Sequence, residues 1–410
     1  MKFINQLRHW RTSHYEPYTS DIAQYAGPTG MRVRPWYRLG LTKSSLLLPP
    51  PYLVLKLNME MLSLNISSYS KPSEYQVSKL PSPSLVDSKD VIVKVYAASI
   101  NPIDVKRADG ALKLAVKDPV SFPFKIGYDC AGVVQETGRD VKKFRIGDAV
   151  YIRLPEVSRG KIACTRYSLT QLLKQNTGSC SEFVRCSEEH IGLKPPSLSF
   201  EEAASIPLAA MTALQALRLY RGDLAGKTVF VPAGCSTPNE IHVLLNMLMT
   251  HIIDYTKSDP RDVIEHGTID FLFDTVGSSM ELLCLMRPGS SRIVSVSTLP
   301  SGNQLQDSPL MDLPHRPTIP FPFRMGLNML DQVRKARAYR YKTEYSYMFL
   351  VSSGENLDEL TRYVEVGRLK TVVGSVVDLQ DIEAVRKACG TVYSGRGGLG
   401  KLVIRVHRPE

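Results

Sequence analysis

Regular alternation of apolar and polar positions begins near Met59. The segments MLSLNISSY (61–69) and KDVIVKVYAASI (89–100) alternate with a period of two, which predicts β-strands. The stretch DCAGVVQETGRDVKKFRIGDAVYI (129–152) adds short strands separated by turns that contain glycine. The pattern therefore predicts a small β-rich domain, which we place at 59–197.

The pattern changes after Leu198. The stretch SFEEAASIPLAAMTALQALRLY (199–220) predicts an Ala-rich helix, because Ser199 and Glu202 form an S-x-x-E capping box. Three runs typical of buried strands follow, with helical stretches between them: TVFVPAG (228–234), DFLFDTVG (270–277) and RIVSVST (292–298). This order is typical of an open parallel sheet, so we expect an α/β domain over 198–345.

Residues 1–58 differ from the rest in composition. They contain several serines and tyrosines, and their arginines outnumber their acids: Arg8, Arg11, Arg32, Arg34 and Arg38 against Glu16 and Asp21. Such a composition is typical of an organelle transit segment, but it also fits an unstructured leader. We expect a mitochondrial or a cytoplasmic protein. In both interpretations, the fold begins near Met59.

Composition and charge exclude several classes of protein. The chain has 410 residues, 43% of them hydrophobic, which is enough for two packed cores. Its net charge of +11 would suit an anionic partner, but the basic residues are scattered and no nucleic-acid-binding motif accompanies them. The apolar run SSLLLPPPYLVLKLNMEML (44–62) is interrupted by three prolines and Lys56. We therefore expect neither nucleic-acid binding nor a membrane span.

The seven cysteines show no C-x-x-C spacing, which indicates reduced thiols. Cys186 and His190 are four positions apart, a spacing that could place two metal ligands on one side of a helix. The sequence does not supply two further metal ligands with a matching spacing, so we interpret the pair as structural. The sequence predicts no metal site.

Five motifs occur in the order found in one known family: AASINPIDVKRADG (97–110), GYDCAGVV (127–134), RIGDAVY (145–151), EEAASIPLAAMTALQAL (201–217) and GRGGLGKLVIRV (395–406). With them the chain resembles the medium-chain dehydrogenase/reductase superfamily, and most of all its zinc-free quinone-oxidoreductase and enoyl-reductase-like branch. The resemblance implies a GroES-like catalytic domain (59–197), a Rossmann-like cofactor domain (198–345), a return to the catalytic domain (346–410) and a possible homodimer.

The resemblance also implies a reaction, the transfer of a hydride from NADPH to a quinone or an α,β-unsaturated carbonyl compound without zinc. Where the alcohol-dehydrogenase branch has its first catalytic cysteine this chain has Asn101, and where that branch has His-Glu the chain has Tyr128-Asp129. Asn101, Lys106 and Asp129 are the catalytic candidates. For each a structural interpretation stays open: Asn101 caps a turn, Lys106 is a solvated charge, and Asp129 orders its loop.

The resemblance implies six cofactor-binding residues: Thr212, Gly234, Ser236, Thr237, Ser297 and Lys401. Thr212 falls where the family's helix faces the nicotinamide carboxamide. The alternative for a threonine inside a helix is a hydrogen bond to the carbonyl four residues earlier.

The expected phosphate-binding turn is unusual. After Gly234 the chain continues with CSTPNE (235–240), where Thr237 and Glu240 form a capping box that starts a helix at Pro238. The carboxylate of Glu240 would occupy the N–H groups that a phosphate needs and would also repel it. The sequence thus predicts a poor phosphate site.

The acid that binds the ribose hydroxyls is also in question. Asp254 follows Gly234 by 20 positions (254 − 234 = 20), near the expected spacing. We favour another alignment, in which a helix, the second strand and the next helix of the Rossmann unit are missing and Asp254 is structural. A further departure from the family is an insert at about 160–177.

Two functions therefore stay open. One is an NADPH-dependent, zinc-free reductase. The other is a reductase-like protein that has lost cofactor binding and acts as an interaction module or is a non-functional variant.

Overall fold

The structure is a computed structural model, and it describes residues 59–111, 122–155, 178–232, 253, 257–311, 318–395 and 400–408. All of these belong to one compact unit that begins at Val54. The leader 1–58, the insert at 160–177 and the expected phosphate-binding stretch 234–240 lie outside the described residues, as does Asp254.

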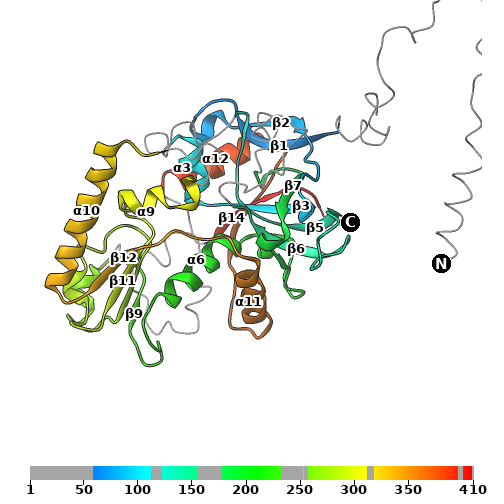
Figure 1. Cartoon of the computed structure of the whole chain (residues 1–410). Helices are drawn as coiled ribbons and strands as arrows, with labels where there is room; N and C mark the ends of the chain where they lie inside the picture. The colour runs from blue at the N-terminus through cyan, green and yellow to red at the C-terminus, as the bar shows by residue number, and fades with distance from the viewer. Residues whose placement is uncertain are drawn as a thin grey trace, which may run out of the picture. The chain divides into compact units, whose positions relative to one another are not determined.

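The first part of the chain forms two sheets, as the alternating pattern predicts (Figure 1). The smaller sheet is antiparallel in the order β2-β1-β4: β1 (Glu60–Ile66), β2 (Gln76–Pro81) and β4 (Phe124–Lys125). The larger sheet has the order β13-β14-β3-β5-β6-β8, with β7 also paired to β3: β3 (Asp90–Ile100), β5 (Asp129–Thr137), β6 (Ala149–Arg153), β7 (Phe183–Ser187), β8 (Ile191–Leu193), β13 (Val373–Asp378) and β14 (Lys401–Arg405).

The end of the chain returns to the larger sheet. Strand β14 pairs antiparallel with β3, and β13 pairs parallel with β14. The helical elements of this part are η1 (Pro72–Glu74), α3 (Pro102–Ala108), η2 (Glu188–His190), α11 (Gly354–Glu365) and α12 (Ile382–Tyr393). The pairing of β14 with β3 brings residues near position 400 beside residues near position 100.

The helical segment expected after Ser199 is present but broken in two, α5 (Phe200–Ala204) and α6 (Pro207–Arg218). The capping box is as predicted, since the Ser199 hydroxyl accepts from the Glu202 N–H (3.1 Å) and the Glu202 carboxylate from the Ser199 N–H (2.8 Å). Pro207 has no N–H to continue the helix, which explains the break.

The second part contains a parallel sheet in the order β12-β11-β10-β9: β9 (Val229–Phe230), β10 (Phe271–Asp274), β11 (Arg292–Ser295) and β12 (Glu344–Tyr347). Its helical elements are α8 (Pro260–Val263), η3 (Leu283–Leu285), α9 (Gly302–Gln306), η4 (Pro309–Met311) and α10 (Phe321–Arg340). All three strands expected from the sequence are present.

Strand β9 lies at the edge of this sheet within the described part of the chain. In a Rossmann sheet of order 3-2-1-4-5-6, the first strand has neighbours on both sides. Strands β9 to β12 match positions 1, 4, 5 and 6 of that order. The described residues thus supply no strand at positions 2 and 3. The deletion expected from the sequence falls on the second of these strands and its two flanking helices.

A shared core connects the parallel sheet to the larger, mostly antiparallel sheet. Buried side chains from β6, α6, β10 and α11 pack together in it, among them Tyr151, Met211, Phe271 and Leu357. The Tyr151 hydroxyl donates to the Leu357 carbonyl at 2.5 Å. Among the described helices, none combines the length and apolar character needed to cross a lipid bilayer.

Candidate functional site

Asn101 lies between β3 and α3 and is fully buried. Its N–H donates to the Asp104 carboxylate at 2.5 Å, which fixes the start of α3. Its side-chain amide donates to Asp129 Oδ2 at 3.0 Å and accepts from the Lys401 ammonium. Both ends of the Asn101 amide are thus engaged by buried charged groups of the protein, so it has a positioning role in this structure.

Asp129 connects several elements. Besides Asn101, its Oδ2 accepts from the Leu208 N–H at 3.1 Å, and its Oδ1 lies 3.8 Å from Arg153 Nε. The Leu208 N–H belongs to the first turn of α6, whose N–H groups need acceptors from outside the helix. Asp129 therefore joins β5 to α6 and β6. The structural alternative considered for this catalytic candidate was the ordering of its own loop.

Burial dominates the electrostatics of this cluster. It raises the pKa of Asp129, and the positive charges of Lys401 and Arg153 oppose the rise. Burial and the charge of Asp129 raise the pKa of Asp104 to about 7. Two acids and two cations thus share one interior site, and the sequence analysis missed Arg153, which comes from the end of β6.

Two other candidates have different environments. Lys106 is exposed on α3, so its ammonium is accessible to a substrate. The Thr212 hydroxyl in α6 donates to the Leu208 carbonyl at 2.5 Å, which is the structural alternative considered for it.

The carboxyl ends of the parallel strands are joined by side-chain hydrogen bonds. The Thr275 hydroxyl, after β10, donates to the Pro232 carbonyl, after β9, at 2.7 Å. The Ser297 hydroxyl, after β11, donates to the Thr275 carbonyl. In open α/β sheets, ligands bind at this edge. The structure thus places Ser297 at the edge where a dinucleotide is expected.

A buried acid shapes the turn at this edge. Asp274 is fully buried, and its Oδ1 accepts from the N–H groups of Gly277 (2.7 Å) and Ser278 (3.1 Å). Gly277 has a φ of +89°, which an L-residue rarely adopts. The sequence analysis did not single out Asp274, although an Asp followed closely by Gly at the end of a strand is a turn signal.

The remaining cofactor candidates, Gly234, Ser236 and Thr237, lie outside the described residues. Their role in phosphate binding stays a prediction.

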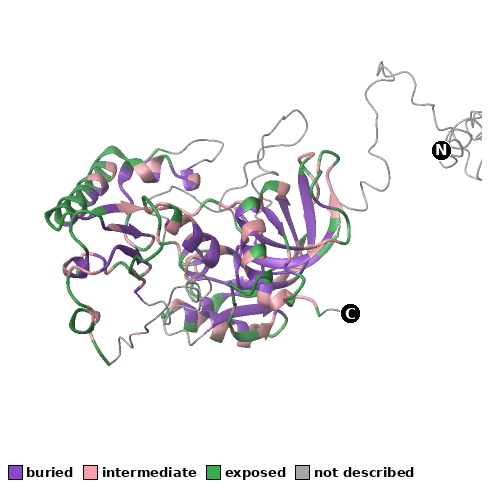
Figure 2. Cartoon of the chain, turned by 90° about the horizontal axis from the view of Figure 1, so that it is seen from below, coloured by how far each residue is buried: buried purple, intermediate pink, exposed green. Residues whose placement is uncertain are grey.

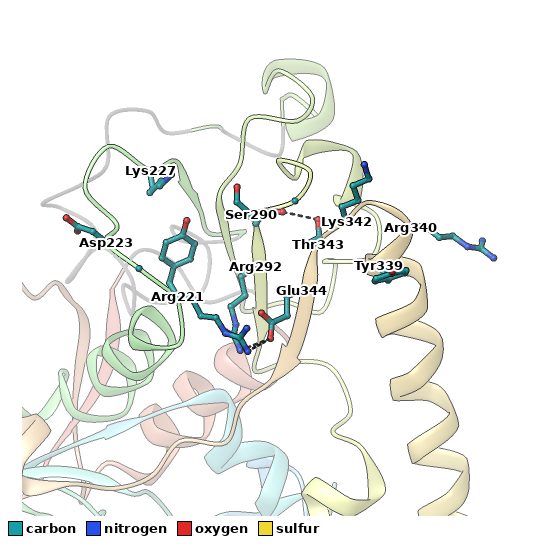
Figure 3. A pocket seen from close by; sticks show the side chains of 14 residues that line it. Arg221, Asp223, Lys227, Ser290, Arg292, Tyr339, Arg340, Lys342, Thr343 and Glu344 are labelled. Carbon is teal, nitrogen blue, oxygen red and sulfur yellow. Dashed lines mark hydrogen bonds and ion pairs between the residues drawn. The ribbon is translucent and has the colours of Figure 1, made fainter.

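A cavity of about 1050 Å³ lies at the opposite edge of the parallel sheet (Figure 3). It is bounded by the loop after α6 and by residues at the amino ends of β11 and β12. Arg221 and Arg292 converge on Glu344, each 3.4 Å from its Oε1. Because ligands of open α/β sheets bind at the carboxyl ends of the strands, we do not assign the dinucleotide to this cavity.

The described residues contain no group of three or more His, Cys, Asp or Glu side chains arranged to hold a metal ion. Cys186 is buried, and burial raises the pKa of its thiol. His190 Nδ1 lies 3.3 Å from the Ser352 carbonyl, and its Nε2 lies 3.4 Å from Glu189 Oε1. These contacts agree with a structural role for the Cys186–His190 pair.

Comparison with known proteins defines the class. Residues 87–196 match the family model of the alcohol dehydrogenase GroES-like domain, and residues 249–404 match that of zinc-binding dehydrogenases. The quinone oxidoreductase of Coxiella burnetii superposes with a TM-score of 0.64 and 23% identity over 85% of this chain and 100% of that chain, which shows the fold. The fold is therefore that of a two-domain oxidoreductase, with a GroES-like and a Rossmann-like domain.

Two relatives with described activities indicate the branch of the family to which the chain is most similar. The NAD(P)H oxidoreductase RTN4IP1, mitochondrial, of Danio rerio is 27% identical over 338 residues, which cover 73% of this chain and 80% of the relative. The 2-methylene-furan-3-one reductase of Solanum lycopersicum is 30% identical over 253 residues, 55% of this chain and 61% of the relative. The chain belongs to the medium-chain dehydrogenase/reductase superfamily, in its quinone- and enoyl-reductase-like branch.

Proposed function

We propose that this chain is a zinc-independent, NADPH-dependent reductase that transfers a hydride to a quinone or an α,β-unsaturated carbonyl compound. The names of its relatives support the nicotinamide cofactor and this range of acceptors: NAD(P)H oxidoreductase, 2-methylene-furan-3-one reductase and NADPH-dependent alkenal/one oxidoreductase. Several relatives are described as mitochondrial, which supports the same location for this chain.

The main observation in support of zinc independence is the hydrogen bond from Lys401 to Asn101. By resemblance, Asn101 takes the place of the first catalytic cysteine of the alcohol-dehydrogenase branch. A thiolate there would bind Zn²⁺, but Asn101 accepts a hydrogen bond from a buried ammonium group instead. A second positive charge, Arg153, lies 3.8 Å from Asp129 in the same cluster. A dication in this place would be repelled by both.

The residues of the chain then divide into two roles. Lys106, which is exposed, is our candidate for stabilising the negative charge that develops on the acceptor's oxygen atom. The buried Asn101, Asp129 and Lys401 act as positioning residues that hold α3 and α6 in place. We assign Ser297 and the turn at Gly277, at the carboxyl edge of the parallel sheet, to the binding of the nicotinamide end. When bound, the nicotinamide supplies the hydride.

We further propose that the chain binds NADPH weakly. Within the described residues no strand flanks β9 on its outer side, where the ribose-binding acid of a Rossmann unit would be placed. Losing two hydrogen bonds to a charged phosphate, at about 1.5–3 kcal/mol each, weakens binding by two or more orders of magnitude. The same observation favours the second candidate function, an interaction module that has lost the cofactor.

Titration with NADPH, followed by the fluorescence of the reduced nicotinamide, separates the two candidates. We expect weak, saturable binding that Gly234→Val abolishes by blocking the approach of the phosphate to the backbone. Gly390→Val is the matched control, because a Cβ atom at Gly390 would meet no atom within 4 Å apart from its sequence neighbours and its own helix backbone. Absence of saturable binding by the unmodified chain would favour the interaction module. Micromolar or tighter binding would refute the proposal that NADPH binds weakly. It would leave the proposed reductase activity standing.

A further inference from the structure

Helix α10 exposes an apolar stripe on the side that faces away from the domain. Leu327, Asp331 and Ala338 are buried on its inner side. On its outer side Met325, Met329 and Val333 follow each other at intervals of four and are 43%, 66% and 58% exposed. Residues four apart lie on one face of a helix, so these side chains form one ridge. An amphipathic surface helix normally carries polar residues there.

The exposed apolar side chains are concentrated in this part of the molecule. Of the twenty large hydrophobic side chains exposed in the described part of the chain, eight lie between 321 and 341: Phe321, Phe323, Met325, Met329, Leu330, Val333, Tyr339 and Tyr341. In Figure 2 the outer surface of α10 is exposed along its length. A concentration of exposed apolar side chains of this kind indicates an interaction surface.

The orientation of the ridge is fixed by bonds on the inner side of α10. Arg324 Nε donates to Asn303 Oδ1 and Arg334 donates to the Leu299 carbonyl, both at 2.8 Å. Gly302 supports the close approach of α9, because a side chain there would meet the Arg324 carbonyl oxygen at 2.2 Å. The ridge therefore does not rotate into the domain without breaking these contacts.

Exposed cations accompany the apolar ridge. Arg340 follows it at the carboxyl end of α10, and Figure 3 shows its side chain pointing away from the Arg292–Glu344 contact. Lys335 and Arg337 are also exposed, although Arg337 donates to the Met280 carbonyl at 3.2 Å. The helix carries one acid, Asp331, which is buried and lies 2.7 Å from Lys335 Nζ. Helix α10 thus carries a net positive charge beside its apolar ridge.

The apolar ridge and the positive charge of α10 indicate what kind of partner binds this surface. A second copy of the chain would place like charges together, and the leader is also rich in arginine. A single helix on the outside of the domain presents a ridge rather than a groove (Figure 1). A bilayer with anionic headgroups accepts a ridge of apolar side chains and pairs with cations beside it, and no membrane span is needed. We propose that α10 docks the protein on the surface of an anionic phospholipid membrane.

Sedimentation of the full chain with lipid vesicles tests this inference. We expect binding to vesicles of phosphatidylcholine and phosphatidylserine, weaker binding to phosphatidylcholine alone, and release by high salt. Met329→Glu with Val333→Glu should lower the vesicle affinity about tenfold or more, because each carboxylate would enter the apolar boundary. Arg337→Glu with Arg340→Glu should lower it by a similar factor.

Val366→Glu is the matched control, since Val366 is 64% exposed on another helix end and should leave vesicle binding unchanged. Melting temperatures of all variants verify that they fold. The inference is overturned if the unmodified chain binds neither type of vesicle, or if the Met329/Val333 variant binds as tightly as the control. A different occupant of the surface would also overturn it. In that case the unmodified chain does not bind anionic vesicles, and Met329→Glu with Val333→Glu abolishes its self-association or its binding to an acidic protein.

Discussion

Replacing Asp129 with alanine removes a carboxylate that is fully buried and holds three elements together. Its loss leaves the Leu208 N–H and the Asn101 amide without their acceptor, at positions where they now make bonds of 3.1 Å and 3.0 Å. It also takes away the carboxylate that lies 3.8 Å from Arg153 Nε. We expect the first turn of α6 and the start of α3 to lose their common anchor.

The magnitude follows from these contacts. Hydrogen bonds to a charged group contribute about 1.5–3 kcal/mol each, and breaking a buried ion pair from one side costs about 3–5 kcal/mol. The two figures overlap in part, because they describe the same carboxylate. We therefore expect Asp129→Ala to lower the free energy of unfolding by roughly 3–5 kcal/mol.

Urea unfolding at neutral pH measures this change. Asp129→Asn keeps the shape of the side chain and one acceptor oxygen, so it should lower the free energy of unfolding less than the alanine variant does. If the alanine variant does not fold, the asparagine variant still allows the measurement. Asp262→Ala is the control, because Asp262 is exposed on α8 and should change stability by less than about 0.5 kcal/mol. A cost for Asp129→Ala below about 1 kcal/mol would refute its role as an anchor.

Three further predictions concern charge, metal and catalysis. Burial raises the pKa of Asp104 from 3.8 to about 7, so the folded protein keeps a proton that the unfolded chain releases; stability should therefore fall as pH rises between these values, and urea unfolding of Asp104→Asn should show a flatter pH dependence. Elemental analysis should find no stoichiometric zinc, and a chelator should leave the melting temperature unchanged; one zinc per chain, lost together with stability, would contradict this. Lys106→Met should lower the rate of quinone reduction about tenfold or more without a change in melting temperature, whereas an unchanged rate would remove Lys106 from the mechanism.

The local elements were predictable from the sequence because local patterns determine them. Period-two alternation gave the positions of β1 and β3, and the capping box at Ser199 gave the start of α5. The break before α6 was not predicted, because the alanine-rich pattern continues across Pro207. Helix α10 has apolar residues on both sides, so its pattern does not tell which side packs against the domain.

The buried cluster was harder to predict, because its members are far apart in the sequence. Asn101 and Asp129 are 28 positions apart, and Asn101 and Lys401 are 300 positions apart. They meet because β14 pairs with β3 and β3 with β5. The resemblance to the family picked out these three residues, but only the tertiary contacts show that they bind one another.

Hydride transfer itself tests the central claim most directly. NADPH in which deuterium replaces both hydrogens at C4 of the nicotinamide is mixed with an enone and the metal-free protein, and the product is examined by mass spectrometry and NMR. The account predicts one deuterium at the carbon β to the carbonyl, at a rate that a chelator does not change. Product without deuterium, or turnover that appears only after zinc is added, would contradict it.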